Sequence, residues 1–230
     1  MKYAICLAAT ALIAYLWGSL NSAIIVVRLL KHEDVREKGS GNAGLTNVLR
    51  VYGKGAALTT LLCDLFKGVI AVVAARIIVG DMLDITFFND RIFIGYIAGL
   101  FVMLGHIFPI YYGFHGGKGV LLAATTLIAM DPLTCLLSVS VFAVVLAFTK
   151  YVSVGSISAA VAYPIFTIIT QTLRDTDGRI QNFIITLLIS TLIIYMHKPN
   201  IKRLRAGTEN KFGQKKKNPI ENDAPNDKNQ

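Results

Sequence analysis

Long apolar runs alternate with short polar connections along most of this chain. The runs occupy residues 3–30, 55–80, 91–112, 119–130, 133–149, 152–172 and 180–197. An α-helix needs about 20 predominantly apolar residues to cross the ~30 Å hydrocarbon core of a bilayer, and most of the runs approach that length. The pattern therefore predicts an all-α integral membrane protein with seven transmembrane helices.

Two of the runs differ from the rest. The run at 119–130 is short and lies between a glycine-rich stretch and Asp131-Pro132, so we expect a tilted or half-inserted helix there. The run at 3–30 lies where a signal peptide would lie, but it is long, is interrupted by polar residues and lacks a suitably placed cleavage site. We expect it to be a retained transmembrane helix.

Basic residues are distributed unequally among the polar connections. The first, third and fifth connections and the C-terminal segment carry Lys and Arg. The connection at 81–90 carries three Asp and no Lys or Arg, and the one at 173–179 is mixed. The positive-inside rule then places the N-terminus outside and the C-terminus in the cytoplasm.

Composition agrees with a membrane protein. The 230 residues are 54% hydrophobic and 16% charged, whereas soluble domains carry about 25% charged residues. We interpret residues 1–211 as a single membrane-embedded domain and residues 212–230, which are basic and then polar, as a disordered cytoplasmic tail. The net charge of +9 indicates contact with membrane lipids rather than nucleic acid, because no nucleic-acid-binding motif accompanies it.

Four polar segments gather on the predicted cytoplasmic side. They are GSGNAGLTNVLR (39–50), HGGKGV (115–120), SVGSIS (153–158) and HKPNIKRLRAGTE (197–209). A transporter more often places its polar groups near the bilayer midplane. Polar chemistry gathered on one face therefore favours an enzyme that acts at the membrane surface.

The first two segments contain the residue types that bind phosphate. Glycines allow successive backbone N–H groups to point inward as an anion-binding nest, and a helix N-terminus adds partial positive charge. The first segment supplies donors at Ser40, Asn42, Thr46, Asn47 and Arg50, and the second supplies Lys118. The alternatives are a flexible connector and a turn with a snorkelling lysine.

Three further pairs of polar residues lie three positions apart, a spacing that places both members on one helix face. They are Ser153 with Ser156, His197 with Asn200, and Asp64 with Lys67. Ser153 is either an N-cap or a ligand contact. Ionisable residues within a span are functional candidates, but we interpret the Asp64 and Lys67 pair as an ion pair that holds a neighbouring loop.

No covalent nucleophile or metal set is recognisable. The chain lacks HxxxxD, GxSxG and HExxH, so it lacks the usual hydrolase and zinc-binding patterns. What remains is a cationic, donor-rich site for more than one phosphate, with no cofactor expected.

Taken together, the motifs resemble a known family. GSGNAGLTNVLR, DLFKG, GHIFP, GGKGV, the Ser153/Ser156 pair and HKPNIKRLRAGTE occur in the order and spacing of the bacterial acyl-phosphate:glycerol-3-phosphate acyltransferases, up to residue 211. Two positions depart from the family pattern. Leu45 stands where a small residue is usual, and Asn21 where proline is common.

The resemblance implies an enzyme of phospholipid synthesis in the bacterial inner (plasma) membrane, with seven spans and its site at the cytoplasmic face. It implies transfer of a fatty acyl group from acyl phosphate to the 1-hydroxyl of sn-glycerol 3-phosphate. The products would be 1-acylglycerol 3-phosphate (lysophosphatidic acid) and phosphate. No acyl-enzyme and no obligate protein partner are expected, and the substrate's own phosphate is the expected base.

Residue roles follow from the motifs and the resemblance. The expected catalytic residues are Lys118, Arg50, Ser156, His197 and Asn200, and the expected substrate-binding residues are Ser40, Asn42, Thr46, Asn47, Ser153, Arg203, Gly207 and Glu209. Two other classes of protein stay open. A phosphate or organophosphate transporter would use the deep charged pair Asp64 and Lys67, and a phosphatidyl- or CDP-alcohol transferase would need a carboxylate cluster for a metal.

Overall fold

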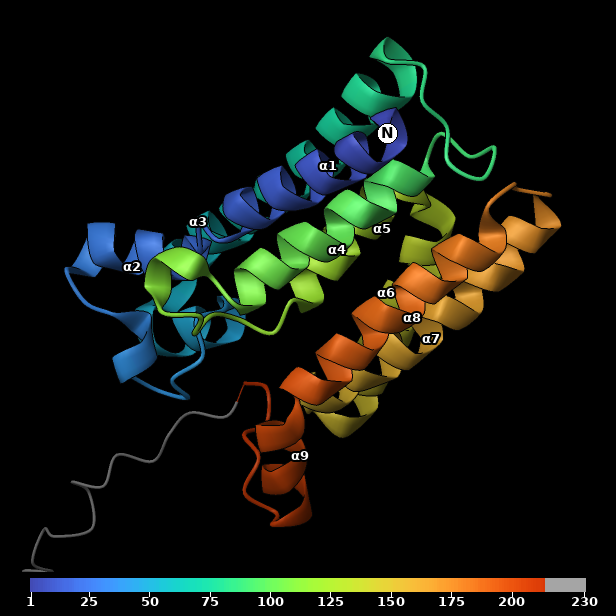
Figure 1. Ribbon diagram of the computed structural model, residues 1–230. Coiled ribbons are helices and arrows are strands. Elements are labelled where there is room, and N and C mark those ends of the chain that lie inside the picture. Colours follow the sequence, from blue (N-terminus) through green and yellow to red (C-terminus); the bar gives the residue numbers. More distant parts are fainter. Residues whose placement is uncertain (214–230) are drawn as a thin grey trace, which may run out of the picture.

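A computed structural model describes residues 1–213 of the chain, and these residues form an α-helical bundle. Helices α1 to α5 pack together on one side of the molecule and α6 to α8 on the other, with α9 at the end of α8 (Figure 1). The two groups meet where α4 packs on α8 and α5 on α6. The expected all-α architecture is confirmed.

The helix bounds follow the apolar runs with some differences. The helices are α1 (Lys2–Gly18), α2 (Ser22–Lys31), α3 (Leu45–Ala75), α4 (Phe93–Ile107), α5 (Val120–Met130), α6 (Pro132–Thr149), α7 (Val152–Leu173), α8 (Arg179–Met196) and α9 (Lys198–Arg205). A π-helical segment, Arg76–Met82, extends α3, and short 3₁₀ turns lie at Val35–Glu37 and Ile110–Tyr112. The predicted tail falls outside the described residues from position 214 onward.

The first apolar run is not one helix, which corrects the expectation for residues 3–30. The helix breaks after Gly18, and Asn21 caps the new helix α2 by accepting a hydrogen bond from the Ile24 N–H. A break inside a membrane helix frees backbone carbonyls that need donors. Lys67 supplies these donors. Its ammonium donates hydrogen bonds to the carbonyls of Leu20 at 3.0 Å and Gly18 at 3.4 Å.

The described part of the chain has five segments that are long and apolar enough to cross a membrane. They are Lys2–Lys31, Phe93–Tyr112, Pro132–Thr149, Val152–Leu173 and Arg179–Met196. Helix α5 has 11 residues and therefore a length of about 16 Å, roughly half of the hydrocarbon core. The short helix expected at 119–130 is confirmed.

Helices α1 and α4 approach each other closely at two glycines. A Cβ added at Gly18 would lie 2.1 Å from the Val102 carbonyl oxygen, and one added at Gly105 would lie 2.1 Å from the Tyr15 carbonyl oxygen. Small residues allow this backbone contact between membrane helices. The Tyr15 hydroxyl also donates to the Phe108 carbonyl at 2.8 Å. The end of α4, from which the chain leads to Lys118, is thereby fixed to α1.

A polar network around Asp131 joins the helices at the opposite end of the bundle from α9. The Asp131 carboxylate accepts hydrogen bonds from Thr134 and Thr170 and pairs with Arg174 at 3.0 Å. These contacts connect the α5–α6 turn to α7. They are structural, since buried polar groups need partners.

Replacing Gly105 by Val tests the α1–α4 contact. We expect the free energy of unfolding to fall by about 1–3 kcal/mol or more, because the new side chain meets backbone that cannot rotate away. Thermal unfolding in detergent measures the effect. Gly55→Val is the matched control, since nothing lies within 4 Å of a Cβ at Gly55. Equal stability of the two variants would contradict the contact.

Candidate active site

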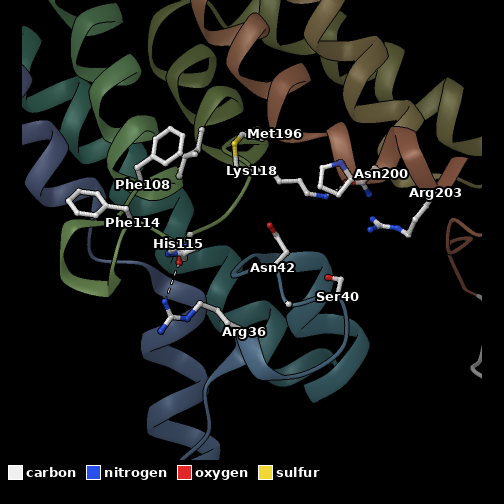
Figure 2. A pocket seen from close by; sticks show the side chains of 14 residues that line it. Arg36, Ser40, Asn42, Phe108, Phe114, His115, Lys118, Met196, Asn200 and Arg203 are labelled. Carbon is white, nitrogen blue, oxygen red and sulfur yellow. Dashed lines mark hydrogen bonds between the residues drawn. The ribbon is translucent and has the colours of Figure 1, made fainter. Parts of the chain in front are cut away.

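A pocket of about 360 Å³ lies where the first polar connection, the glycine-rich loop before α5, the end of α8 and helix α9 converge (Figure 2). Three of the four polar segments singled out by sequence therefore contribute to one site. Its lining residues are Arg36, Ser40, Gly41, Asn42, Ile107, Phe108, Phe114, His115, Gly116, Lys118, Met196, Pro199, Asn200 and Arg203.

Lys118 extends across the pocket from the connection before α5. Its ammonium donates a hydrogen bond to the Asn200 side-chain oxygen of α9, and Figure 2 shows the two side chains pointing toward each other. The backbone before Lys118 is fixed by the Gly117 N–H, which donates to the His106 carbonyl at 3.1 Å. Any Cβ at Gly117 would lie 2.1 Å from the His106 ring nitrogen Nε2, so this position requires glycine.

Glu209 is the centre of a hydrogen-bond network behind the pocket. Its carboxylate accepts from the Ser153 hydroxyl at 2.9 Å, the Asn200 amide at 2.7 Å and the Arg203 Nε at 2.6 Å. Burial by itself raises the pKa of Glu209. The hydrogen bonds from Asn200, Arg203 and Ser153 together outweigh this effect, so the pKa lies below its usual value. A charged Glu209 thus orients Asn200 and Arg203 toward the pocket.

Gly207 forms the turn that leads from α9 to Glu209. It has φ +68°, a left-handed conformation that glycine adopts without strain. It directly follows Ala206, the C-cap of α9, and the Thr208 N–H donates back to the Arg203 carbonyl at 2.9 Å. The turn returns the chain toward α7, where Glu209 meets Ser153.

The pocket has an excess of positive charge. Burial and the nearby Arg203 and Arg50 together lower the pKa of Lys118 to about 8, although Glu209 acts in the opposite direction. Desolvation and neighbouring cations both disfavour a charged lysine. A phosphate anion would reverse this balance, which makes the pocket a favourable place for one.

The loop at 39–44 is held in shape by Asn47. The buried Asn47 accepts a hydrogen bond from the Ser40 N–H at 2.9 Å and donates to the carbonyls of Val35 and Lys38 at 3.0 Å each. Both its donor hydrogens and its acceptor are thus used inside the loop. Asn47 thus positions the loop, and Ser40 and Asn42 line the pocket. A substrate contact by Asn47 itself stays a prediction.

Several other expected site residues do not line the pocket. Thr46 and Arg50 are exposed on the first turns of α3, and Arg50 lies close enough to Lys118 to influence its pKa. Ser156 donates to the Val152 carbonyl of its own helix at 2.9 Å. The buried His197 has its Nδ1 2.7 Å from the Ile193 carbonyl, so Nδ1 is the donor and Nε2 remains for another partner.

Sequence reasoning did not identify Arg36 or the apolar wall of the pocket. Arg36 pairs with Asp34 at 2.8 Å and donates to the Tyr112 carbonyl at 2.7 Å, which ties the first connection to the chain after α4. Phe108, Phe114 and Met196 form an apolar side of the pocket (Figure 2). Apolar residues next to a membrane carry no sequence signal of their own.

Asp64, Lys67 and His106 form a buried cluster that lies against Gly117, the residue before Lys118. The Asp64 carboxylate lies 3.0 Å from the Lys67 ammonium and 3.7 Å from His106 Nδ1. Lys67 contacts the α1–α2 break, and the His106 carbonyl accepts from Gly117. The expected ion pair is confirmed, and the cluster supports the loop that carries Lys118.

Asp64→Asn should destabilise the protein by about 3 kcal/mol, because it leaves the Lys67 charge buried without its partner. The double variant D64N/K67Q removes both charges but keeps an amide donor for the carbonyls at the α1–α2 break, and it should recover part of that loss. Thermal unfolding of the two purified proteins in detergent makes the comparison. If the double variant is no more stable than the single one, the pair does not act as a charge-compensated unit.

The family model described as "Glycerol-3-phosphate acyltransferase" matches residues 8–207. The chain belongs to the glycerol-3-phosphate acyltransferase family. The chain is therefore an integral membrane enzyme that transfers an acyl group to glycerol 3-phosphate. Residues 1–213 contain no group of three or more His, Cys, Asp or Glu side chains placed to hold a metal.

Relatives in this family match nearly the whole chain. The glycerol-3-phosphate acyltransferase of Clostridioides difficile (strain 630) is 41% identical over 206 residues, which cover 90% of this chain and 95% of the relative. The enzyme of Coxiella burnetii (strain Dugway 5J108-111) is 42% identical over 200 residues, which cover 87% and 95%.

Two crystal structures of PlsY (YgiH), an integral membrane glycerol 3-phosphate acyltransferase, share the fold. The glycerol 3-phosphate form has a TM-score of 0.75 and 32% identity, covering 90% of this chain and 96% of that one. The lysophosphatidic acid form has a TM-score of 0.73 and 30% identity, covering 90% and 95%.

Proposed function

We propose that this acyltransferase uses acyl phosphate as its donor and acylates the 1-hydroxyl of glycerol 3-phosphate, releasing phosphate and lysophosphatidic acid. We also propose seven spans, with the N-terminus outside and the pocket at the cytoplasmic leaflet. Two features of the sequence support this orientation. Lys and Arg are concentrated in alternate connections, and the four polar segments all fall on the side that carries these basic residues. The related PlsY structures with glycerol 3-phosphate and with lysophosphatidic acid support the acceptor and the product.

The observation that carries the proposal is the position of Lys118. Its ammonium lies between the Ser40–Asn42 loop and the Asn200–Arg203 face of α9 (Figure 2). Two phosphate groups bound from these two sides would both lie within reach of one cation. We assign Ser40, Asn42 and Arg50, with Lys118, to phosphate binding, and Asn200 and Arg203 to the opposite side of the pocket.

The chemistry needs no covalent intermediate. The 1-hydroxyl oxygen attacks the acyl carbonyl carbon, the bond from that carbon to the phosphate oxygen breaks, and phosphate leaves with the electron pair. The hydroxyl proton passes to the acceptor's own phosphate. Acyl phosphate is already activated, so holding the reactants together and offsetting negative charge supply most of the acceleration. Lys118 has the position to do both.

Besides two phosphate groups, the site must accept an acyl chain, and the apolar part of the pocket wall provides a surface for it. Phe108, Phe114 and Met196 face the same space as Lys118, and Phe114 is exposed. An acyl chain could therefore lie along this apolar side while its phosphate stays with the cations. The transporter alternative depended on Asp64 and Lys67, and this pair is occupied in holding the α1–α2 break and the neighbouring loop.

Substituting the two cations tests the proposed function. Lys118→Ala and Arg50→Ala should each lower the rate of glycerol 3-phosphate-dependent phosphate release from acyl phosphate by about 100-fold, as expected for loss of a charge that stabilises the transition state. Purified protein in detergent with a soluble acyl phosphate is the assay. Lys54→Ala, an exposed lysine on α3, is the control and should keep wild-type activity. Wild-type rates in both Lys118→Ala and Arg50→Ala, or no acceptor-dependent release in the wild type, would refute the proposal.

The pH dependence should report the same lysine. A lysine is charged below its pKa, and that of Lys118 in the free enzyme is about 8, so kcat/KM should fall as the pH rises through about 8. Arginine stays charged in this range. The residual activity of Lys118→Arg should therefore lack this alkaline fall. Initial rates on both sides of pH 8 provide the comparison, and an unchanged profile in Lys118→Arg would assign the fall to another group.

A further inference from the structure

We propose that the outer face of α9 is a binding site for the head group of an anionic phospholipid. Lys198, Ile201, Lys202 and Arg205 line a hollow of about 360 Å³ on this face. The spacing of the three cations, at positions i, i+4 and i+7, places them on one side of the helix. The site is separate from the acyltransfer pocket, since no residue lines both.

Helix α9 has two faces with different tasks. Asn200 and Arg203 face inward, where both bind the Glu209 carboxylate. Lys198, Lys202 and Arg205 are exposed, and none of them forms an ion pair with any residue in the range 1–213. Three uncompensated cations around one hollow strongly favour an anion with several oxygens.

The position of the hollow selects a lipid as the source of that anion. Helix α8 is long and apolar enough to cross a membrane, and α9 begins two residues after it ends. The hollow therefore lies at the level where phospholipid phosphates lie. The Lys198 ammonium lies 3.9 Å from the centre of the Tyr195 ring, and exposed tyrosines next to cations are typical of the membrane interface.

Lipid binding on the outer face would act on the inner face through the rigid helix. A head group held by Lys198, Lys202 and Arg205 fixes the angle of α9 and, with it, the positions of Asn200 and Arg203 beside Lys118. An anionic membrane should therefore increase acyltransfer. This last step rests on the proposed function, whereas lipid binding itself does not.

Retention of phospholipid by the full chain tests the binding site. The wild-type protein is prepared from bilayers of phosphatidylcholine with phosphatidylglycerol, and the retained lipids are counted by native mass spectrometry. The variant K198Q/K202Q/R205Q should retain about tenfold less phosphatidylglycerol, as expected when three cations near a charged surface are removed. The substituted residues are exposed. An unfolding temperature equal to that of the wild type, in this variant and in its control, would show that both proteins are folded.

The control variant is K31Q/K54Q/K150Q, which removes the same charge from exposed positions outside α9. Both variants keep the lysines at 215–217. Wild-type retention by the α9 variant, or an equal loss in the control, would overturn the proposal. Displacement of the lipid by inorganic phosphate would also overturn it, because the site would then belong to a free anion.

Activity provides the second readout. Acyltransfer by the wild type should be faster in bilayers with phosphatidylglycerol than in phosphatidylcholine alone, and the α9 variant should lose this difference. Retained lipid without any effect on the rate would refute the link to the catalytic pocket. An inactive wild type that still retains phosphatidylglycerol would refute the proposed function and leave the lipid site standing.

Discussion

The contact between the Lys118 ammonium and the Asn200 amide joins the two helical groups across the pocket. Lys118 belongs to the group of α1 to α5, and Asn200 follows α8. Each end of the contact has its own support. The Lys118 backbone depends on the close fit between Gly117 and His106, and Asn200 is held by Glu209. The site therefore exists only when both groups are folded and packed together.

Three polar side chains with little exposure, Lys67, Asn47 and Glu209, support that arrangement. An unpaired polar group is costly wherever it is buried away from water, so each buried donor or acceptor strongly fixes its neighbours. Lys67 fixes the α1–α2 break, Asn47 fixes the loop of Ser40, and Glu209 fixes α9. The groups left facing the pocket are mostly cations and amides, which suits a site for phosphate.

Sequence alone predicts the membrane class, most helices and the polar segments of the site, because apolar length and the clustering of glycine with cations are local features. It does not predict the break at Ser19–Asn21, since the donor that makes it possible, Lys67, is distant in the chain. Nor does it separate Asn47, which shapes the loop, from Asn42, which lines the pocket. That distinction depends on which backbone groups surround each amide, and only the folded structure shows it.

A double-mutant cycle between Lys118 and Asn200 tests the central claim most directly. The affinity for glycerol 3-phosphate would be measured by calorimetry for the wild type, Lys118→Ala, Asn200→Ala and the double variant. If the two side chains hold the substrate as one unit across the pocket, their effects are not additive, and the coupling free energy should be at least about 0.5 kcal/mol. Additive effects would show that the two sides act independently, and the account of a shared phosphate site would be wrong.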